Sequence, residues 1–505
     1  MEVKLTDCYT LSEGKALMSG TEALVRLLLE QSRIDRMNGL RTKGLVSGYP
    51  GSPLGGLDIA LGKAKSFLDE EGIYFQPAVN EELAATALWG SQHINLYDNP
   101  SVQGVFSMWY GKGPGLDRAM DALRHANQGG VAPHGGMVIA VGDDPTGKSS
   151  TLAYQSDQNF HSLGIPYFFP KNVSEIIPMG LEAFALSRYS GCCVGLKIVV
   201  DTADSNAVVD MSRLRPNFPK MKPNKLVHVT KHDPAGARES KLHEIRLPEV
   251  QKWCAKSENA VQIYLPVKKG KTRLGIIGVG KIANEINEAL ITLLPDGGKS
   301  NTVAFTALNM PWPLPEQSLS DMLSIAEEVL VIEEKRSFVE DQIAKICVKK
   351  DRNMLLSGKT NPDGENLLPS YGELSLENII NVIAERASHH SIELNPLKEL
   401  SLVKKLDEIP VRQPYYCAGC PHNSSTKASD GEIVGMGIGC HSISGFIHPD
   451  TITNFTQMGG EGAFWIGRAP FSERSHSFQN MGDGTYAHSG YLGVRAAVAA
   501  GVNIT

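Results

Sequence analysis

Three short pieces of sequence decide the fold class: Cys417-Ala418-Gly419-Cys420-Pro421-His422, Gly437-Ile438-Gly439-Cys440 and Gly482-Asp483-Gly484. The first two supply three thiols with the spacing C-x2-C-x19-C, which is typical of metal ligands. The third offers one carboxylate to a hard cation and lets phosphate oxygens approach the backbone closely. Together they predict an α/β unit built around cofactors, in an enzyme that transfers electrons.

Residues 494–505 predict a helix followed by the opening of a strand. A folded domain rarely ends inside a strand that would be central to its sheet. We therefore expect this chain to be the N-terminal part of a longer protein, truncated at its C-terminal end, so that part of its active site is missing.

Length and composition set broad limits. The chain has 505 residues, of which 42% are apolar and 21% charged, as expected for a globular protein of about two to four domains. Its net charge of -6 provides no electrostatic footprint for nucleic acid or an anionic membrane. The sequence has no apolar run of about 18 residues, no signal peptide and no secreted-type disulfide framework. We expect a cytoplasmic protein that binds neither nucleic acid nor membrane.

Strands alternate with helices along most of the chain, which predicts parallel sheets. The expected strands lie at 44–49, 102–108, 136–141, 195–200, 303–308 and 328–332, and the expected helices include 20–30, 81–96 and 336–348. Stretches at about 205–265, rich in Pro, Lys and Asp, and near 395–415 are interpreted as linkers. This organisation predicts three α/β units, at 1–225, 265–395 and 410–505.

Residues 142–149, Gly-Asp-Asp-Pro-Thr-Gly-Lys-Ser, match the P-loop pattern and follow a predicted strand. A P-loop holds phosphate with backbone N–H groups in a positive field. The adjacent carboxylates of Asp143 and Asp144, together with Pro145, oppose both requirements. We predict that this loop does not bind a nucleotide.

Residues 278–283, Gly-Val-Gly-Lys-Ile-Ala, match the dinucleotide-binding pattern G-x-G-x-x-A. The next strand, at 302–309, ends without the acidic residue that would bind a ribose. We interpret the pattern as a tight strand–helix turn in a domain that does not bind a nucleotide.

The three thiols are compatible with iron–sulfur and with zinc, and His422 or His441 would then complete a zinc site. Isolated buried cysteines are a further alternative. The neighbouring diphosphate motif favours iron–sulfur, because a structural zinc ion has no reason to lie beside it.

Glu81 begins a predicted helix and is followed by small residues at Ala84, Ala87 and Gly90, which we expect to share one face and admit a flat group. Alone, this carboxylate would be interpreted as a cap favoured by the helix dipole. Beside a Gly-Asp-Gly motif, the pattern N-E-x-x-A-x-x-A-x-x-G resembles the helix of thiamine diphosphate enzymes, in which a Glu hydrogen-bonds the aminopyrimidine ring.

Together these features resemble the 2-oxoacid:ferredoxin oxidoreductase family, most closely its indolepyruvate branch in the long fused bacterial form. The resemblance covers nearly the whole chain. It is carried by Ser47-Gly48-Tyr49-Pro50-Gly51-Ser52-Pro53-Leu54-Gly55-Gly56, Met108-Trp109-Tyr110-Gly111-Lys112-Gly113-Pro114-Gly115, Gly142-Asp143-Asp144, Leu186-Ser187-Arg188-Tyr189-Ser190-Gly191-Cys192, Glu333-Glu334-Lys335-Arg336 and Gln457-Met458-Gly459-Gly460-Glu461-Gly462.

The resemblance implies the thiamine diphosphate-binding fold: a pyrimidine domain at 1–225, a transketolase-C-like domain at 265–395, and an incomplete iron–sulfur and pyrophosphate domain at 410–505. It implies that Glu81 activates thiamine diphosphate and that Ser52 contacts substrate. It also implies that Gly439, Gly482, Asp483 and Gly484 bind the cofactor, with Asp483 holding magnesium, and that Cys417, Cys420 and Cys440 bind a [4Fe-4S] cluster. The family pattern also includes a metal-binding Asn further along the chain, and Asn503 comes too early to be that residue. It includes a fourth cluster cysteine as well, and no cysteine follows Cys440 in this sequence.

The implied reaction is oxidative decarboxylation of an aryl 2-oxo acid of the indolepyruvate type, with coenzyme A capturing the acyl group and ferredoxin taking the electrons. A homo-oligomer is expected. Two alternatives stay open: a non-oxidative thiamine diphosphate decarboxylase, and a zinc-binding α/β protein that is not an enzyme.

Overall fold

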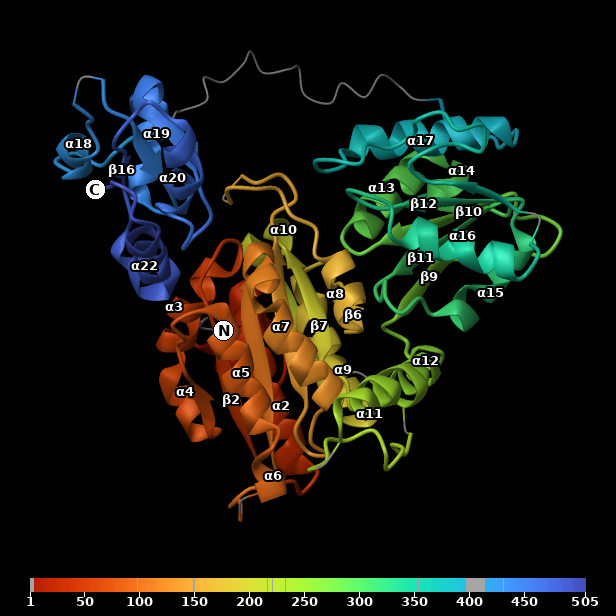
Figure 1. Ribbon diagram of the computed structural model, residues 1–505. Coiled ribbons are helices and arrows are strands. Elements are labelled where there is room, and N and C mark those ends of the chain that lie inside the picture. The colour runs from red at the N-terminus through yellow and green to blue at the C-terminus, as the bar shows by residue number, and fades with distance from the viewer. Residues whose placement is uncertain are drawn as a thin grey trace. The chain divides into compact units, whose positions relative to one another are not determined.

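The computed structural model describes residues 4–396 and 414–505, except residues 98, 149, 216, 220, 232, 353 and 430 and the side chains of 296 and 453. The chain divides into two compact units, Met1–Leu397 and Lys398–Thr505 (Figure 1). The two units predicted at 1–225 and 265–395 thus belong to one compact body. The linker predicted near 395–415 falls almost wholly outside the described residues.

The first unit begins with a six-stranded parallel sheet in the order β3-β2-β4-β5-β7-β6. Its strands are β2 (Thr42–Gly48), β3 (Ile73–Phe75), β4 (Gly104–Lys112), β5 (Met137–Asp143), β6 (Tyr167–Phe168) and β7 (Val194–Val199). The α/β class predicted from the sequence is confirmed. Beside this sheet, β1 (Lys15–Ser19) and β8 (Asn206–Asp210) pair as an antiparallel ribbon.

Helices cover both faces of the six-stranded sheet, as its buried central strands require. One face packs on α2 (Gly20–Met37), α3 (Leu57–Lys63) and α9 (Val173–Ser190), and the other on α5 (Glu81–Ser91), α7 (Gly113–Gly129) and α8 (Asp157–Leu163). Side chains alternate accordingly: Met108 and Tyr110 face α2, whereas Trp109 faces α5. Short helices complete this part: α1 (Asp7–Thr10), η1 (Leu54–Gly56), α4 (Lys65–Glu70), α6 (Ile94–Tyr97), α10 (Val200–Asp204) and η2 (Met211–Arg213).

The second sheet of the first unit has the order β13-β12-β10-β11-β9, and β9 is its single antiparallel strand. Its strands are β9 (Val261–Leu265), β10 (Leu274–Val279), β11 (Val303–Leu308), β12 (Glu328–Ile332) and β13 (Leu355–Ser357). One face packs on α13 (Ile282–Leu293) and α17 (Leu376–His389), and the other on α15 (Glu316–Ile325) and α16 (Val339–Lys349). The turn α14 (Pro295–Gly298) precedes β11. A single apolar cluster runs from this sheet into the first, which joins them into one body.

The segment predicted as a linker at about 205–265 is folded, which corrects that interpretation. It contains α11 (Ala235–Ser240), the π-helical turn η3 (Lys241–Arg246) and α12 (Leu247–Cys254). Val250, Trp253 and Cys254 are buried in the core of the first sheet. Their i, i+3, i+4 spacing marks an amphipathic helix, and the many Pro, Lys and Asp residues around them obscured it.

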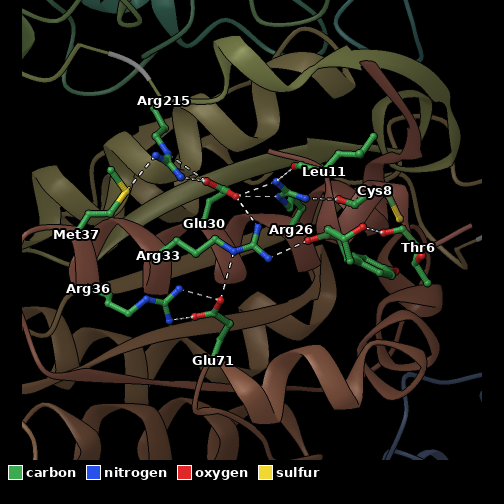
Figure 2. A network of polar contacts seen from close by, with 12 residues as sticks. Thr6, Cys8, Leu11, Arg26, Glu30, Arg33, Arg36, Met37, Glu71 and Arg215 are labelled. Carbon is green, nitrogen blue, oxygen red and sulfur yellow. Dashed lines mark hydrogen bonds and ion pairs between the residues drawn. The ribbon is translucent and has the colours of Figure 1, made fainter. Parts of the chain in front are cut away.

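A network of arginines on α2 anchors the N-terminal segment (Figure 2). Arg26 is buried, pairs with Glu30 at 2.9 Å, and donates to the backbone carbonyls of Cys8 and Leu11. Arg33 also pairs with Glu30, at 2.7 Å. Since buried charges are tolerated only when paired and hydrogen-bonded, the network holds the N-terminal turn against the sheet.

The second unit holds a three-stranded parallel sheet in the order β15-β14-β16. Its strands are β14 (Val434–Met436), β15 (Ile452–Phe455) and β16 (Phe478–Gln479). Ile504 forms a parallel bridge beside Ser477, which agrees with the strand opening predicted for the last residues. The helical segments are α18 (His422–Ser425), η4 (Cys440–Ile443), α19 (Ser444–Ile447), η5 (Pro449–Thr451), α20 (Ala463–Arg468), η6 (Ala469–Phe471), α21 (Asp483–Thr485), η7 (Tyr486–Gly490) and α22 (Tyr491–Ala500).

Within the described ranges, no helix is both long enough and apolar enough to cross a membrane.

Candidate functional site

The first sheet has a topological switch point between β2 and β4. The chain leaves β2 toward β3 on one side, and leaves β4 toward β5 on the other. Open α/β sheets bind ligands outside the carboxyl ends of the strands at such a point. The loop that follows β2 carries Ser52, β4 ends at Lys112 where α7 begins, and the helix that follows β3 begins with Glu81.

Glu81 is held at the first turn of α5 by its neighbours. Asn80 caps the helix, its side chain accepting a hydrogen bond from Leu83 N at 2.9 Å. Trp109 Nε1 donates to the backbone carbonyl of Glu81 at 3.0 Å, which ties the turn to β4. Glu81 is 5% exposed, whereas Glu82 lies in solvent. The carboxylate chosen from the sequence is thus the buried one of the pair.

Lys112 is a residue of this site to which the sequence analysis assigned no role. Its half-buried side chain lies against Gly51, whose added Cβ would meet Lys112 Cδ at 2.8 Å, so it is next to the loop of Ser52. Burial lowers the pKa of Lys112, and the nearby Glu81 opposes that shift. Among the described residues no hydrogen bond or ion pair joins its ammonium group. An unpaired, half-buried ammonium suits an anionic ligand.

The small residues that follow Glu81 do not share one face, which corrects that expectation. Ala84 is buried with Glu81, but Ala87 and Gly90 are exposed. Steps of three residues drift around a helix of 3.6 residues per turn, so that the residue nine positions on lies on the opposite side. The backbone that packs closely against Glu81 is instead that of Gly115 in α7. A Cβ placed on Gly115 would lie 2.8 Å from Glu81 Oε1.

The second unit has its own switch point, between β14 and β16. The chain leaves β14 toward β15 on one side, and the residues that follow β16 return to pair on its other side at Ile504. The loop after β14 contains Gly439 and Cys440, and the loop after β16 contains Gly482, Asp483 and Gly484. The two loops touch, because Thr485 Oγ1 donates to Ile438 O at 3.1 Å. The thiol motif and the diphosphate motif thus meet at one sheet edge.

Asp483 is exposed and is the first residue of a helical run that continues through η7 and α22. Glycine on either side of it is not required by the fold: Gly482 has φ -77 and its added Cβ would meet nothing closer than 3.7 Å, and at Gly484 no atom lies within 4 Å. A carboxylate between two uncrowded glycines at a helix start suits a cation and a diphosphate. The donor set therefore fits magnesium diphosphate.

Gly439 differs from these two glycines. Its φ is 149, and its added Cβ would meet the His441 ring at 2.8 Å, so the fold itself requires glycine here. The loop is closed by His441, whose Nε2 accepts a hydrogen bond from Gly437 N at 3.2 Å. Burial lowers the pKa of His441 and keeps its ring neutral. His441 thus has an internal role, which argues against the zinc ligand considered from the sequence.

Glu461 supports the same loop, a role that the stretch 457–462 did not reveal in the sequence. It is 1% exposed, and its carboxylate accepts hydrogen bonds from Gly459 N at 2.7 Å and Ile438 N at 3.3 Å. Burial raises its pKa, against these hydrogen bonds. Glu461 therefore braces the backbone that presents Cys440.

All three predicted ligand cysteines are free thiols near the surface, with Cys417 and Cys440 exposed and Cys420 half-buried. Their segments are joined by Tyr416, whose hydroxyl donates to His441 O at 3.5 Å. Cys8, Cys192, Cys193 and Cys254 are buried instead, and burial raises the pKa of each. The alternative of isolated buried cysteines fails for the three candidates.

The three sulfurs do not stand at the spacing of a formed zinc site. A tetrahedral zinc with bonds of about 2.3 Å would hold sulfurs about 3.8 Å apart. Within the described residues Cys417, Cys420 and Cys440 do not form a group with all ligand atoms inside 4.8 Å. Cysteines that bind different iron atoms of a cluster stand further apart than the ligands of one zinc ion, so three separate thiols are compatible with a cluster.

Only Glu328, His389 and His390 form a compact group of metal-type ligands in the described part of the chain. Arg386 makes a bidentate pair with Glu328 at 2.7 and 2.8 Å, and His390 Nε2 adds a contact of 2.8 Å. A cation would be repelled by the guanidinium, so this group is an ion-pair network.

In the two turns that match nucleotide-binding patterns, groups of the protein itself occupy the space or the hydrogen-bond donors that a nucleotide would use. In the loop after β5, Asp144 Oδ1 accepts from Gly147 N at 2.9 Å and Lys148 N at 3.2 Å, which takes the N–H groups a phosphate would need. In the turn after β10, an added Cβ at Gly280 would meet the Phe169 ring at 2.1 Å. Both geometries agree with the expectation that neither turn binds a nucleotide.

Asn503 lies at the wrong end of its strand for a metal site. Its Nδ2 donates to Ser475 O at 3.1 Å, before β16 begins, whereas Asp483 follows the end of β16. This agrees with the expectation that Asn503 comes too early to bind the metal.

Comparisons with known proteins point to one family. A model of the indolepyruvate oxidoreductase domain matches residues 266–409. Indolepyruvate oxidoreductase subunit IorA of Methanothermobacter marburgensis is 26% identical over 506 residues, covering 97% of this chain and 74% of that protein. The subunit of the same name from Pyrococcus abyssi is 26% identical over 481 residues, covering 91% and 67%.

A solved structure shares the fold. It is a 2-oxoglutarate:ferredoxin oxidoreductase from Magnetococcus marinus, similar with a TM-score of 0.51 at 16% identity over 74% of this chain and 65% of that one. The thiamine diphosphate-binding fold type expected from the sequence is thereby confirmed.

Proposed function

We propose that this chain, an oxidoreductase of the 2-oxoacid:ferredoxin oxidoreductase family, whose members use thiamine diphosphate, carries out oxidative decarboxylation of an aryl 2-oxo acid of the indolepyruvate type. The products are an acyl-coenzyme A and reduced ferredoxin. The observation that carries the proposal is the meeting of the thiol loop and the Gly-Asp-Gly loop at one switch point. A non-oxidative decarboxylase would have no use for the thiols.

When bound, thiamine diphosphate supplies a nucleophilic carbon and an electron sink for decarboxylation, and an iron–sulfur cluster supplies one-electron transfer. Asp483 is assigned to magnesium, and Gly439, Gly482 and Gly484 to close backbone approach of the diphosphate. Cys417, Cys420 and Cys440 are assigned to the cluster. The part of these residues is to hold the charges of the metal and of the diphosphate in place.

Glu81 is assigned to the pyrimidine ring. Glu81 is 5% exposed at the start of α5, and a buried carboxyl group fixed on a helix can hydrogen-bond a ring nitrogen without competition from water. Ser52 and Lys112 lie at the same switch point, and we assign their hydroxyl and ammonium groups to hydrogen bonding and countercharge for the carboxylate of a 2-oxo acid. The domain assignments proposed are pyrimidine-binding for 1–225, transketolase-C-like for 265–395, and iron–sulfur and pyrophosphate-binding for 410–505.

The test is anaerobic purification followed by metal and cofactor analysis. We expect stoichiometric iron with a broad absorption near about 400 nm, as thiolate-ligated iron–sulfur gives, and magnesium-dependent binding of thiamine diphosphate. Stoichiometric zinc without iron would refute the proposal. Thiamine diphosphate binding without iron would point to the non-oxidative decarboxylase.

The substrate is tested separately by ferredoxin reduction with indolepyruvate, phenylpyruvate and 2-oxoglutarate, each with and without coenzyme A. We expect the two aryl acids to be preferred and reduction to depend on coenzyme A. A preference for 2-oxoglutarate would refute the aryl assignment while leaving the family reaction intact.

A further inference from the structure

A histidine ring contacts one of the three candidate cluster ligands. His422 Nδ1 lies 3.1 Å from Cys420 Sγ. The two residues stand two positions apart, at the turn where α18 begins. Both side chains are half-buried, so the contact is not one between two freely exposed surface groups.

The direction of this hydrogen bond follows from the chemistry of a ligand sulfur. A cysteine that binds iron does so as a thiolate and carries no proton. The contact then persists only if His422 Nδ1 carries the hydrogen and donates it to Cys420 Sγ. N–H donors to a charged sulfur form the stronger class of hydrogen bond.

His422 is held in place by one contact to its ring and one to its backbone. Tyr416 stacks on it with ring centroids 5.5 Å apart and an angle of 21°. The backbone carbonyl of His422 accepts from Thr426 Oγ1 at 2.6 Å, and Thr426 Oγ1 in turn accepts from the Tyr416 hydroxyl at 3.0 Å. Tyr416 and Thr426 are both buried. The donor is therefore preorganised before any metal binds.

We propose that His422 is a positioning residue that donates a hydrogen bond to Cys420 Sγ and so raises the reduction potential of the cluster. The proposal rests on the iron–sulfur cluster of the proposed function. A donor to a ligand sulfur stabilises the additional negative charge of the reduced cluster more than it stabilises the oxidised cluster. Electron acceptance from the decarboxylation step is thereby favoured.

The experiment compares four forms of the full-length enzyme purified without oxygen: wild type, His422→Phe, His422→Asn and His476→Phe. Phenylalanine keeps the stacking on Tyr416 and removes the donor. Asparagine keeps an N–H near the position of Nδ1. His476 is a half-buried histidine of the same unit, hydrogen-bonded to Thr505 Oγ1 at 3.0 Å, and serves as the matched control.

The readouts are iron and sulfide content, and the cluster potential from a redox titration followed by electron paramagnetic resonance. At a fixed ambient potential, we expect His422→Phe to lower the ratio of reduced to oxidised cluster about tenfold, which is about 59 mV for one electron. We expect His422→Asn to recover most of this shift. His476→Phe should match wild type.

The possible outcomes separate the two proposals. A wild type without iron would refute the proposed cluster, and the role of His422 with it. Full iron and an unchanged potential in His422→Phe would overturn the role of His422 alone. If His422→Phe holds no iron, retained iron in His422→Asn supports the positioning role. Loss of iron in both variants would overturn it, because His422 would then be an iron ligand.

Discussion

Glu81 and Asp483 occupy equivalent places in two different sheets. Each is the first residue of a helical segment, α5 or α21, and each stands beside the switch point of a parallel sheet. Their surroundings are opposite. Glu81 is 5% exposed and stands against Gly115, whereas Asp483 is exposed between two uncrowded glycines.

The difference shows how two acidic residues at helix starts can be suited to two different roles. A helix N-terminus favours an anion in both places. Burial shields Glu81 from water, which suits a carboxyl group that hydrogen-bonds a ring, while the exposure of Asp483 leaves it available to a cation. Environment, and not residue type, separates the two proposed roles.

The variant Glu81→Gln is expected to have the largest effect and tests the role proposed for the buried carboxyl group. General acid–base groups contribute about 10²–10⁴-fold, and we expect a loss of that order in hydrogen–deuterium exchange at the thiazolium C2 of added thiamine diphosphate. Diphosphate affinity should change little, because Glu81 is assigned to the pyrimidine ring. Glu82→Gln, an exposed neighbour on the same helix, is the control. Wild-type exchange in Glu81→Gln with slow exchange in Glu82→Gln would move the role to Glu82.

The corresponding change in the second unit is Asp483→Asn. Loss of one charged ligand should weaken magnesium-dependent binding of thiamine diphosphate by about 10–100-fold, since hydrogen bonds and ligand contacts to charged groups contribute about 1.5–3 kcal/mol. The measurement is calorimetric titration at several magnesium concentrations. Asp450→Asn, at an exposed aspartate of the same unit, should bind as wild type. Equal affinity in the two variants would remove Asp483 from the site.

Lys112→Met tests the countercharge on the side of Glu81. We expect KM for the 2-oxo acid to rise about tenfold with a smaller change in kcat, because a charged contact to the substrate carboxylate is lost. Steady-state ferredoxin reduction measures both constants. Lys43→Met, a lysine of β2 away from the carboxyl end of the sheet, is the control. A loss confined to kcat would contradict the assignment to substrate binding.

A matched pair of glycines provides the smallest and most specific test. Gly115→Ala places a methyl group 2.8 Å from Glu81 Oε1, so the carboxyl group must shift, and a displacement of a few tenths of an ångström should slow C2 exchange by about 3- to 10-fold. Gly484→Ala meets nothing within 4 Å, so the free energy of unfolding of the cofactor-free protein should change by less than about 0.5 kcal/mol.

The two variants also distinguish a glycine that is required by close packing within the protein from a glycine that leaves space for a ligand. Gly484→Ala should weaken diphosphate binding measurably despite its intact stability, as a backbone made for close approach would. Gly115→Ala should bind diphosphate as wild type. The reverse pattern would show that the open space at Gly484 serves no ligand.

Buried strands were the part of the fold most open to prediction. The strands expected at 303–308 and 328–332 coincide with β11 and β12, because strands of a parallel sheet are near-continuous apolar runs with turn residues at both ends. The start of α5 was also readable, since Asn80 is a strong helix cap. The helical fold of 235–254 was missed, because its apolar residues are sparse among polar ones.

The site was only partly predictable. Glu81, Asp483 and the three thiols stand in local patterns that carry chemical meaning without knowledge of the fold. Lys112 and Glu461 lie in stretches that carry the family resemblance, but those stretches by themselves assign neither residue a role. Their roles depend on neighbours distant in sequence: Gly51 and Glu81 for Lys112, and Gly437 and Ile438 for Glu461.

The sequence by itself determined the α/β class, the family resemblance and the residue types that can hold metal and diphosphate, because hydrophobic period, caps and ligand spacing are local properties. Only the tertiary structure decided which glycine turns are open. Asp144 and Phe169 fill the turns at 142–149 and 278–283, while the loops at Gly482 and Gly484 stay uncrowded. The physical reason is that the residue types in a turn determine its backbone conformation, whereas side chains from distant parts of the chain determine whether a ligand has room beside it.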